Sequence, residues 1–176
     1  MGEIHVSMIS ELEEGIDHVR GPAAAPVVLE YGDYECPYSR QAFRAIEKVE
    51  RRRPGGVRFV FRHFPLVEIH PHALSAAAGA EAAALQGRFW EMHDLLFRRQ
   101  HALDDDALRA YADEVGLDLL RFERDRSGRE VLERIGRDRA GGEASGEVKG
   151  TPTLFIDGVV HRGAYDVETL LQALAR

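Results

Sequence analysis

The sequence has a single cysteine among its 176 residues, at Cys36. One thiol cannot form a disulfide within the chain, which agrees with a reducing compartment. It also leaves too few soft ligands for a cysteine-based structural zinc site, because such sites combine several cysteine and histidine ligands at characteristic spacing. Any sulfur chemistry in this chain therefore has to run through one residue.

Long apolar runs are also missing. No segment approaches the roughly 20 apolar residues of a membrane span, and the N-terminus, MGEIHVSMISELEEG, carries acids instead of the apolar centre of a signal peptide. An excess of positive charge is missing too, since Lys+Arg 23 against Asp+Glu 30 gives a net charge of −7. Phosphate binding needs a concentrated basic face. We therefore expect a cytoplasmic protein that has neither nucleic acid nor a membrane as partner.

Two short apolar runs flank a helical pattern in the N-terminal third. The first, PVVLEY at 26–31, is rich in β-branched residues, and the second, VRFVFRH at 57–63, alternates apolar and polar side chains. Both patterns favour strands. Between them, Pro37 opens a pattern with apolar residues on one helix face, which ends at Pro54. The order predicts a β-α-β unit, with Cys36 at the junction of strand and helix.

The remaining sequence indicates helices first and a hairpin later. Asp157-Gly158 separates apolar runs at 154–156 and 159–162, which is a strong hairpin signal. A last helix is expected from about Asp166, and a turn is expected at Gly141-Gly142. We expect one α/β domain over 17–176, with a helical insertion at about 67–127 and an N-terminal extension at 1–16. Helical patterns cover about 71–85, 89–97, 104–115, 117–126 and 129–139.

Four motifs together resemble one protein family. They are VVLEYGDYECPYS, RHFPLVEIHPHA, GRFWEMHDLLF and GTPTLFIDGVVHRGAY, in this order. The chain is similar to the thioredoxin-fold disulfide oxidoreductases typified by bacterial DsbA, in the subgroup with a compact helical insertion. The resemblance implies a thioredoxin-like α/β fold, with the insertion between the β-α-β unit and the C-terminal hairpin plus helix. Similar domains are fused to some sodium/proton antiporters, but this chain has no membrane part and is expected to act free-standing.

The active-site turn departs from the family at one position. The family pattern is usually Cys-x-x-Cys, and here Ser39 stands at the second cysteine position. A second thiol would release the mixed disulfide made by the first, and a hydroxyl cannot do so. A thiol at a helix N-terminus faces unpaired N–H groups that favour the thiolate, so we interpret Cys36 as reactive and not as a buried structural thiol. For Ser39 two interpretations stay open: a hydrogen bond to the Cys36 sulfur, or one to its own helix backbone.

Glu30 and the segment Thr151-Pro152 complete the predicted site. Glu30 stands in the predicted strand 26–31, where burial is costly unless the acid is used or paired. The resemblance implies that this acid handles a cysteine proton behind the active-site turn; the alternative is a strand-edge glutamate that reaches solvent.

Thr151-Pro152 matches the cis-proline loop of the family, which would present backbone groups of Thr151 to an extended substrate. The alternative is an ordinary trans proline that opens a strand. Pro37 and Tyr38, next to the thiol, are the other predicted substrate-binding residues.

The histidines invite a metal interpretation. His70 and His72 flank Pro71, and His63 and His93 are further candidates. A structural zinc ion prefers cysteine and histidine ligands at characteristic spacing, and scattered histidines with one cysteine do not supply them. We therefore predict no metal site.

These observations favour a single-thiol enzyme. Cys36 would attack a disulfide of a protein or peptide, and glutathione or another low-molecular thiol would act as co-substrate, with no bound cofactor. This chemistry suits deglutathionylation or disulfide isomerisation. Two alternatives stay open. The turn Cys-Pro-Tyr-Ser is similar to those of kappa-class glutathione transferases and chromene-carboxylate isomerases, which would activate glutathione for a small-molecule substrate. The site could instead hold peptides without turnover.

Overall fold

The computed structural model describes residues 11–176, so most of the predicted extension 1–16 lies outside the described residues. A five-stranded sheet forms its centre, in the order β1-β3-β2-β4-β5. β2 and β3 are parallel, and the other neighbours are antiparallel. Parallel strands need a crossover connection, which α1 (Pro37–Arg52) supplies, so the predicted β-α-β unit is confirmed. The strands are β1 (His18–Arg20), β2 (Val27–Gly32), β3 (Arg58–His63), β4 (Thr153–Ile156) and β5 (Val159–Val160).

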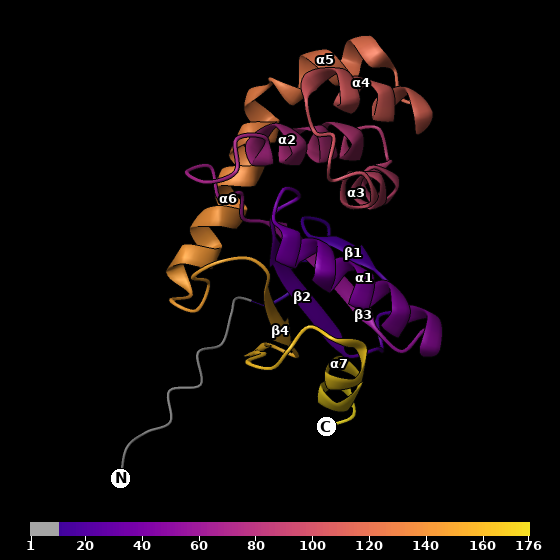
Figure 1. Ribbon diagram of the computed structural model, residues 1–176, viewed down its shortest axis with the longest axis vertical. Helices are drawn as coiled ribbons and strands as arrows, with labels where there is room; N and C mark the ends of the chain where they lie inside the picture. Colours follow the sequence, from indigo (N-terminus) through magenta and orange to yellow (C-terminus); the bar gives the residue numbers. More distant parts are fainter. Residues whose placement is uncertain (1–10) are drawn as a thin grey trace.

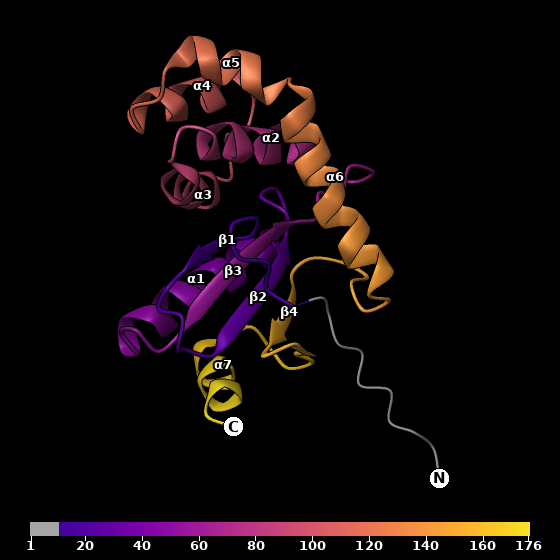
Figure 2. The same cartoon turned by 180° about the vertical axis from the view of Figure 1, so that it is seen from behind.

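The helices form a layer beyond one end of the sheet and flank the sheet itself. Helices α2 to α5 gather in that layer, and α6 runs from the layer along the sheet, as Figure 1 and Figure 2 show from opposite sides. Helices α4, α5 and α7 each begin after an aspartate whose side chain accepts a backbone N–H of the first turn. The helices after α1 are α2 (Ala73–Ala84), α3 (Phe89–Arg98), α4 (Asp105–Glu114), α5 (Leu119–Arg126), α6 (Arg129–Ala144) and α7 (Val167–Leu174).

Alternation along the strands gives the sheet two different apolar faces. Val28 of β2 belongs to the main core, which also contains apolar residues of α1, the insertion helices and α7. Its neighbour Leu29 points to the other face and joins a smaller core with Val60 and Phe155. Residue 30 has the same parity as Val28, so the strand pattern places Glu30 on the face that α1 covers.

The structure differs from the sequence prediction at three places. The strand β1 was not predicted, because three residues carry no readable alternation and the pairing with β3 defines them. The second hairpin strand is shorter than expected and ends at Val160. The predicted turn at Gly141-Gly142 is wrong, since both residues lie inside α6. A Cβ at Gly142 would lie 3.0 Å from ring atoms of Phe64 and Tyr31, so this glycine permits close packing of α6 on the sheet.

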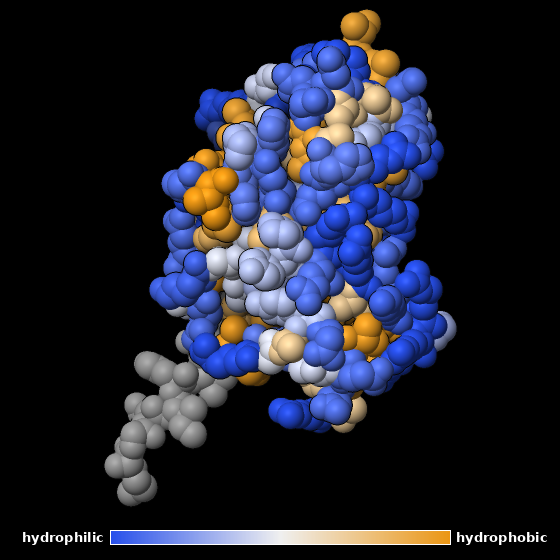
Figure 3. Space-filling view, in the orientation of Figure 1, coloured by the Kyte–Doolittle hydropathy of each residue, from blue (hydrophilic) through white to orange (hydrophobic). Residues whose placement is uncertain are grey.

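The surface is mostly hydrophilic on the side seen in Figure 3, and hydrophobic residues appear there as small separate patches. Within residues 11–176, no helix combines the length and the apolar character that crossing a membrane requires.

Candidate active site

The thiol of Cys36 lies at the start of α1, directly after the loop that leaves β2. Cys36 is the residue before the first helical turn, with extended backbone angles (φ −74°, ψ 122°), and Pro37 takes the first helical position. Proline suits this position because its ring fixes a helical φ and it has no N–H to leave unpaired. The side chain of Cys36 is 3% exposed. Cys36 is therefore at the expected junction, but it is buried, as the alternative of a structural thiol assumed, and its reactivity stays a prediction.

The segment Thr151-Pro152 lies against this thiol. The Thr151–Pro152 peptide bond is cis, and Cys36 Sγ donates a hydrogen bond of 3.2 Å to the carbonyl oxygen of Thr151. Pro152 is buried, whereas Pro37 and Tyr38 are exposed, Tyr38 by 62%. Of the four predicted substrate-binding residues, Thr151 contacts the thiol directly although it is 115 positions away in the sequence, and the other three are chain neighbours of Cys36 or Thr151.

Ser39 makes neither of the two hydrogen bonds that the sequence suggested. Its side chain is fully buried, and its hydroxyl oxygen accepts the backbone N–H of Asp33 at 3.2 Å. Within the described residues, its hydrogen bond is therefore to the loop before the thiol, and not to the sulfur or to its own helix. The reason is geometric: the first turn of α1 faces back onto the loop at residue 33. The bond ties the start of the helix to the active-site loop.

Glu30 is buried in the centre of the sheet. β2 pairs with both β3 and β4, and Glu30 stands opposite Phe61 and Leu154, so the interpretation as a strand-edge residue is wrong. The side chain is 0% exposed, and neither carboxylate oxygen has a hydrogen-bond partner among the described residues. Burial raises the pKa of Glu30 from 4.5 to about 8. The residue is therefore an uncharged acid at neutral pH that retains a proton to give.

Gly32 makes room for this acid. A Cβ at Gly32 would lie 2.8 Å from Glu30 Oε1 and 2.5 Å from a ring atom of Phe61. A Cβ atom essentially never lies this close to a non-bonded atom, so a larger residue would push the carboxyl group or the ring aside.

Asp33 organises the active-site loop and was not predicted from the sequence. Its carboxylate accepts the backbone N–H of Glu35 at 2.8 Å and that of Leu66 at 2.9 Å, and it lies 2.7 Å from His70 Nδ1. The first bond is an Asx turn, which aspartate commonly forms with the residue two positions on. The Asp-Tyr-Glu stretch before Cys36 carried that signal. The loop is therefore held both by itself and by the segment after β3.

Two more side chains fix the backbone around the thiol. Gln100 Nε2 donates to the carbonyl oxygens of Tyr34 and Cys36, at 2.8 Å each. Glu35 accepts the backbone N–H of His72 at 2.6 Å. These contacts connect the active-site loop to the helical insertion, and nothing in the local sequence of Gln100 indicated its role.

Below the loop, Tyr34 and His93 form a buried pair, with Tyr34 Oη 2.9 Å from His93 Nδ1. Burial raises the pKa of Tyr34 well above 10.0 and holds the pKa of His93 well below 6.5. Both groups are therefore neutral over the physiological range. His93 therefore lies within the buried core.

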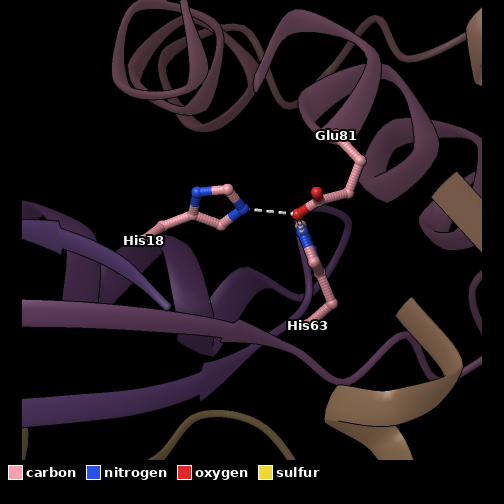
Figure 4. A group of neighbouring side chains, drawn as sticks. All are labelled: His18, His63 and Glu81. Atoms are coloured by element: carbon pink, nitrogen blue, oxygen red, sulfur yellow. Dashed lines mark hydrogen bonds and ion pairs between the residues drawn. The ribbon is translucent and has the colours of Figure 1, made fainter. Parts of the chain in front are cut away.

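A second polar cluster connects the sheet to the insertion. Glu81 of α2 lies between two imidazoles, 2.6 Å from His18 Nε2 and 2.7 Å from His63 Nε2, as Figure 4 shows. Burial alone would raise the pKa of Glu81, but hydrogen bonds and charge from the two histidines outweigh it and hold the pKa below 4.5. The sequence reasoning missed this cluster, because its members come from β1, β3 and α2.

The three ligand atoms of this cluster lie within 4.8 Å of one another, close enough to hold a metal ion. A metal-bound histidine usually donates its second ring nitrogen to an acceptor. His63 Nδ1 is buried and has no such partner within the described residues. The geometry therefore fits a carboxylate shared by two imidazoles better than a metal centre. The candidate pair His70 and His72 is split, since His70 contacts Asp33 and His72 contacts Glu35.

Comparisons with known proteins agree with this arrangement. A family model described as thioredoxin matches residues 13–176. Among solved structures, a thioredoxin-like oxidoreductase from Silicibacter pomeroyi superimposes with a TM-score of 0.81 at 28% identity, over 93% of this chain and 92% of that one. BdbD from Bacillus subtilis also gives 0.81, at 18% identity over 96% of each chain. The fold is also that of alpha-DsbA1 from Wolbachia pipientis, with a TM-score of 0.80 at 19% identity over 93% of this chain and 92% of that one. The chain belongs to the thioredoxin family.

Curated relatives place the same domain in a longer chain. A protein named Na(+)/H(+) antiporter NhaA 1 from Salinispora arenicola is 44% identical over 170 residues, which are 96% of this chain and 26% of that protein. A namesake from Mycolicibacterium vanbaalenii is 41% identical over 174 residues, 28% of its length. The chain thus spans about a quarter of these relatives, which agrees with the antiporter-fused subgroup. Free-standing action stays a prediction.

Proposed function

We propose that this domain catalyses thiol–disulfide exchange through the single thiol of Cys36. The observation that carries the proposal is the contact of Cys36 Sγ with the carbonyl oxygen of Thr151, 3.2 Å away, beside the cis bond to Pro152. An extended peptide that pairs with the Thr151 backbone would bring its own disulfide to this sulfur. The names of the structural relatives, an oxidoreductase and a thiol-disulfide exchange protein, support the same chemistry.

The reaction has two exchange steps. In the first, the Cys36 thiolate attacks one sulfur of a substrate disulfide, forms a mixed disulfide and expels the other sulfur as a thiolate. In the second, a free low-molecular thiol such as glutathione attacks the substrate-derived sulfur and releases Cys36 as a thiolate. Ser39 cannot perform this second step, because its hydroxyl stays protonated and is a poor nucleophile toward sulfur. Turnover therefore depends on the external thiol.

Glu30 is proposed to exchange a proton with the Cys36 site through water. It is a protonated, unpaired acid on the side of the sheet that α1 covers. A carboxyl group with a pKa of about 8 can lose and regain a proton near neutral pH, which suits thiol chemistry. The dependence on a reduced external thiol is also the reason to propose that the domain works in a reducing compartment such as the cytoplasm.

The test is the mass of the protein after incubation with oxidised glutathione, with Cys36→Ala as the control. The expected product carries one glutathionyl group, which added reduced glutathione removes. No adduct, or an adduct that persists in Cys36→Ala, would overturn the proposal. Activity toward a small-molecule substrate that needs glutathione but leaves Cys36 unmodified would favour the glutathione-activating alternative, and peptide binding without exchange would favour the binding module.

A further inference from the structure

A cavity of about 340 Å³ opens beside the active-site turn, between α1, the end of α3 and the start of α7. Pro37 lines it at the end nearest the thiol, and Gln100, which holds the carbonyl oxygens of Tyr34 and Cys36, forms part of its wall. Tyr165 and Val167 line it from the α7 side. The cavity therefore begins at Pro37, the residue that follows Cys36, and Gln100 connects its wall to the active-site loop.

Three cations line this cavity. Arg40, Arg44 and Lys48 are four residues apart on α1, so they lie along one face of the helix. Within residues 11–176, none of them forms an ion pair. Arg44 and Lys48 are exposed, and Arg40 has a buried Nε without a hydrogen-bond partner and one contact of 3.5 Å from Nη2 to the Arg98 carbonyl oxygen.

Two other arginines near the cavity do form ion pairs. Arg52, at the end of the same helix, pairs with Glu168, and Arg98 pairs with Glu47. The acid in the cavity wall, Asp166, is already used, since its carboxylate accepts the backbone N–H and the hydroxyl of Thr169 at 2.9 and 2.7 Å. Like charges four residues apart on a helix repel each other. The chain as a whole has a net charge of −7, whereas this cavity carries a row of unpaired cations. The local positive charge favours an anionic ligand.

We propose that this cavity binds the carboxylates of an acidic low-molecular thiol, of the kind glutathione represents, while its sulfur is bonded to Cys36. This inference rests on the proposed function and names the small-molecule partner of the same site. The step is balanced: the Cys36 thiolate attacks oxidised glutathione, a glutathionyl group becomes disulfide-bonded to Cys36, and reduced glutathione leaves as a thiolate. Arg44 and Lys48 hold the carboxylates, and the apolar wall at Tyr165 packs against the peptide part.

The experiment compares rates of Cys36 modification by two small disulfides, followed by mass spectrometry. One is oxidised glutathione, which is negatively charged, and the other is 2-hydroxyethyl disulfide, which is neutral. The ratio is the rate with oxidised glutathione divided by the rate with 2-hydroxyethyl disulfide. It should fall by about tenfold in Arg44→Glu and in Lys48→Glu, because reversing a charge removes the attraction for the anion. The control is Arg51→Glu, an exposed cation of α1 outside the cavity lining, which should keep the ratio of the unmodified protein. Added salt should lower the ratio in the unmodified protein.

The outcomes separate this inference from the proposed function. If neither disulfide modifies Cys36, the proposed function fails. If both disulfides modify Cys36 but the ratio is the same in Arg44→Glu, Lys48→Glu and Arg51→Glu, the cavity does not bind the anion and only the inference fails. If the two cavity variants slow exchange with an acidic peptide disulfide but not with oxidised glutathione, the cavity serves protein substrates and the inference is overturned.

Discussion

Replacing Glu30 with glutamine should stabilise the folded protein, and by more at high pH. In the folded state the pKa of Glu30 is about 8, against 4.5 for a glutamate in water, because burial penalises the charged form. The folded state therefore holds this proton more tightly than the unfolded state. As pH rises from 4.5 towards 8, the unfolded chain loses the proton first, and the free energy of unfolding falls. Above pH 8 both states are ionised and the effect is constant.

The size of the effect follows from the difference between the pKa of Glu30 in the folded state and the pKa of a glutamate in water. One pKa unit corresponds to about 1.4 kcal/mol, so Glu30 destabilises the fold by roughly 3 kcal/mol at pH 7 and by at most roughly 5 kcal/mol well above pH 8. Glutamine has nearly the same shape and cannot ionise. Glu30→Gln should therefore match the original protein near pH 4 and exceed its free energy of unfolding by a few kcal/mol at pH 8.5.

Urea unfolding at a series of pH values measures this difference. Glu130→Gln is the matched control, because Glu130 is exposed on α6 and its replacement should produce no comparable gain at high pH. A stability difference for Glu30→Gln that is the same at pH 4 and pH 8.5 would refute the reasoning, since it would mean that Glu30 ionises alike in both states. If Glu30 also exchanges a proton with Cys36, the variant should exchange disulfides more slowly while it is more stable.

Three further predictions concern the neighbouring groups. Ser39→Cys should convert a trapped mixed disulfide into an internal disulfide, because a second thiol one helical turn from Cys36 can displace the bound group. The mass of this variant after incubation with oxidised glutathione tests the prediction, and a glutathionyl adduct that persists would contradict it. Glu81→Gln should lower the free energy of unfolding by about 1–3 kcal/mol at pH 6, because two histidines lose an ionised partner. Since the pKa of Glu81 in the folded state is below 4.5, its contribution is present above pH 4.5 and is lost as the pH falls. The free energies of unfolding of the two proteins should therefore become equal in acid, and a difference that stays the same at every pH would contradict the prediction. Gly32→Ala should destabilise the fold by about 1–3 kcal/mol through its contacts with Phe61 and Glu30, whereas Gly136→Ala, where nothing lies within 4 Å, should be neutral or stabilising; equal thermal midpoints for the two alanine variants would disprove the close packing at Gly32.

The local parts of this fold were readable from the sequence. The apolar run at 26–31, Pro37 as a helix start and the alternation at 57–63 predicted β2, α1 and β3 to within about two residues, as is usual for element boundaries. The Asp157-Gly158 turn was also readable, because both residues adopt positive φ values, 47° and 80°, which few other pairs accept. In each case neighbouring residues decide the structure, and so the sequence carries the signal.

Tertiary structure alone decided the rest. The three residues of β1 are a strand because β3 lies beside them, and Gly141-Gly142 is helical because α6 packs closely on the sheet. The sequence named Cys36, Ser39 and Glu30 but could not show which atoms meet.

The contacts of the site join distant segments. Cys36 meets a carbonyl oxygen 115 residues away, and Glu81 joins histidines from two different strands. Such contacts depend on how whole elements pack, and the burial that results sets the proton affinity of Glu30. The sequence therefore determined which groups are present, and packing determined their partners and their charge.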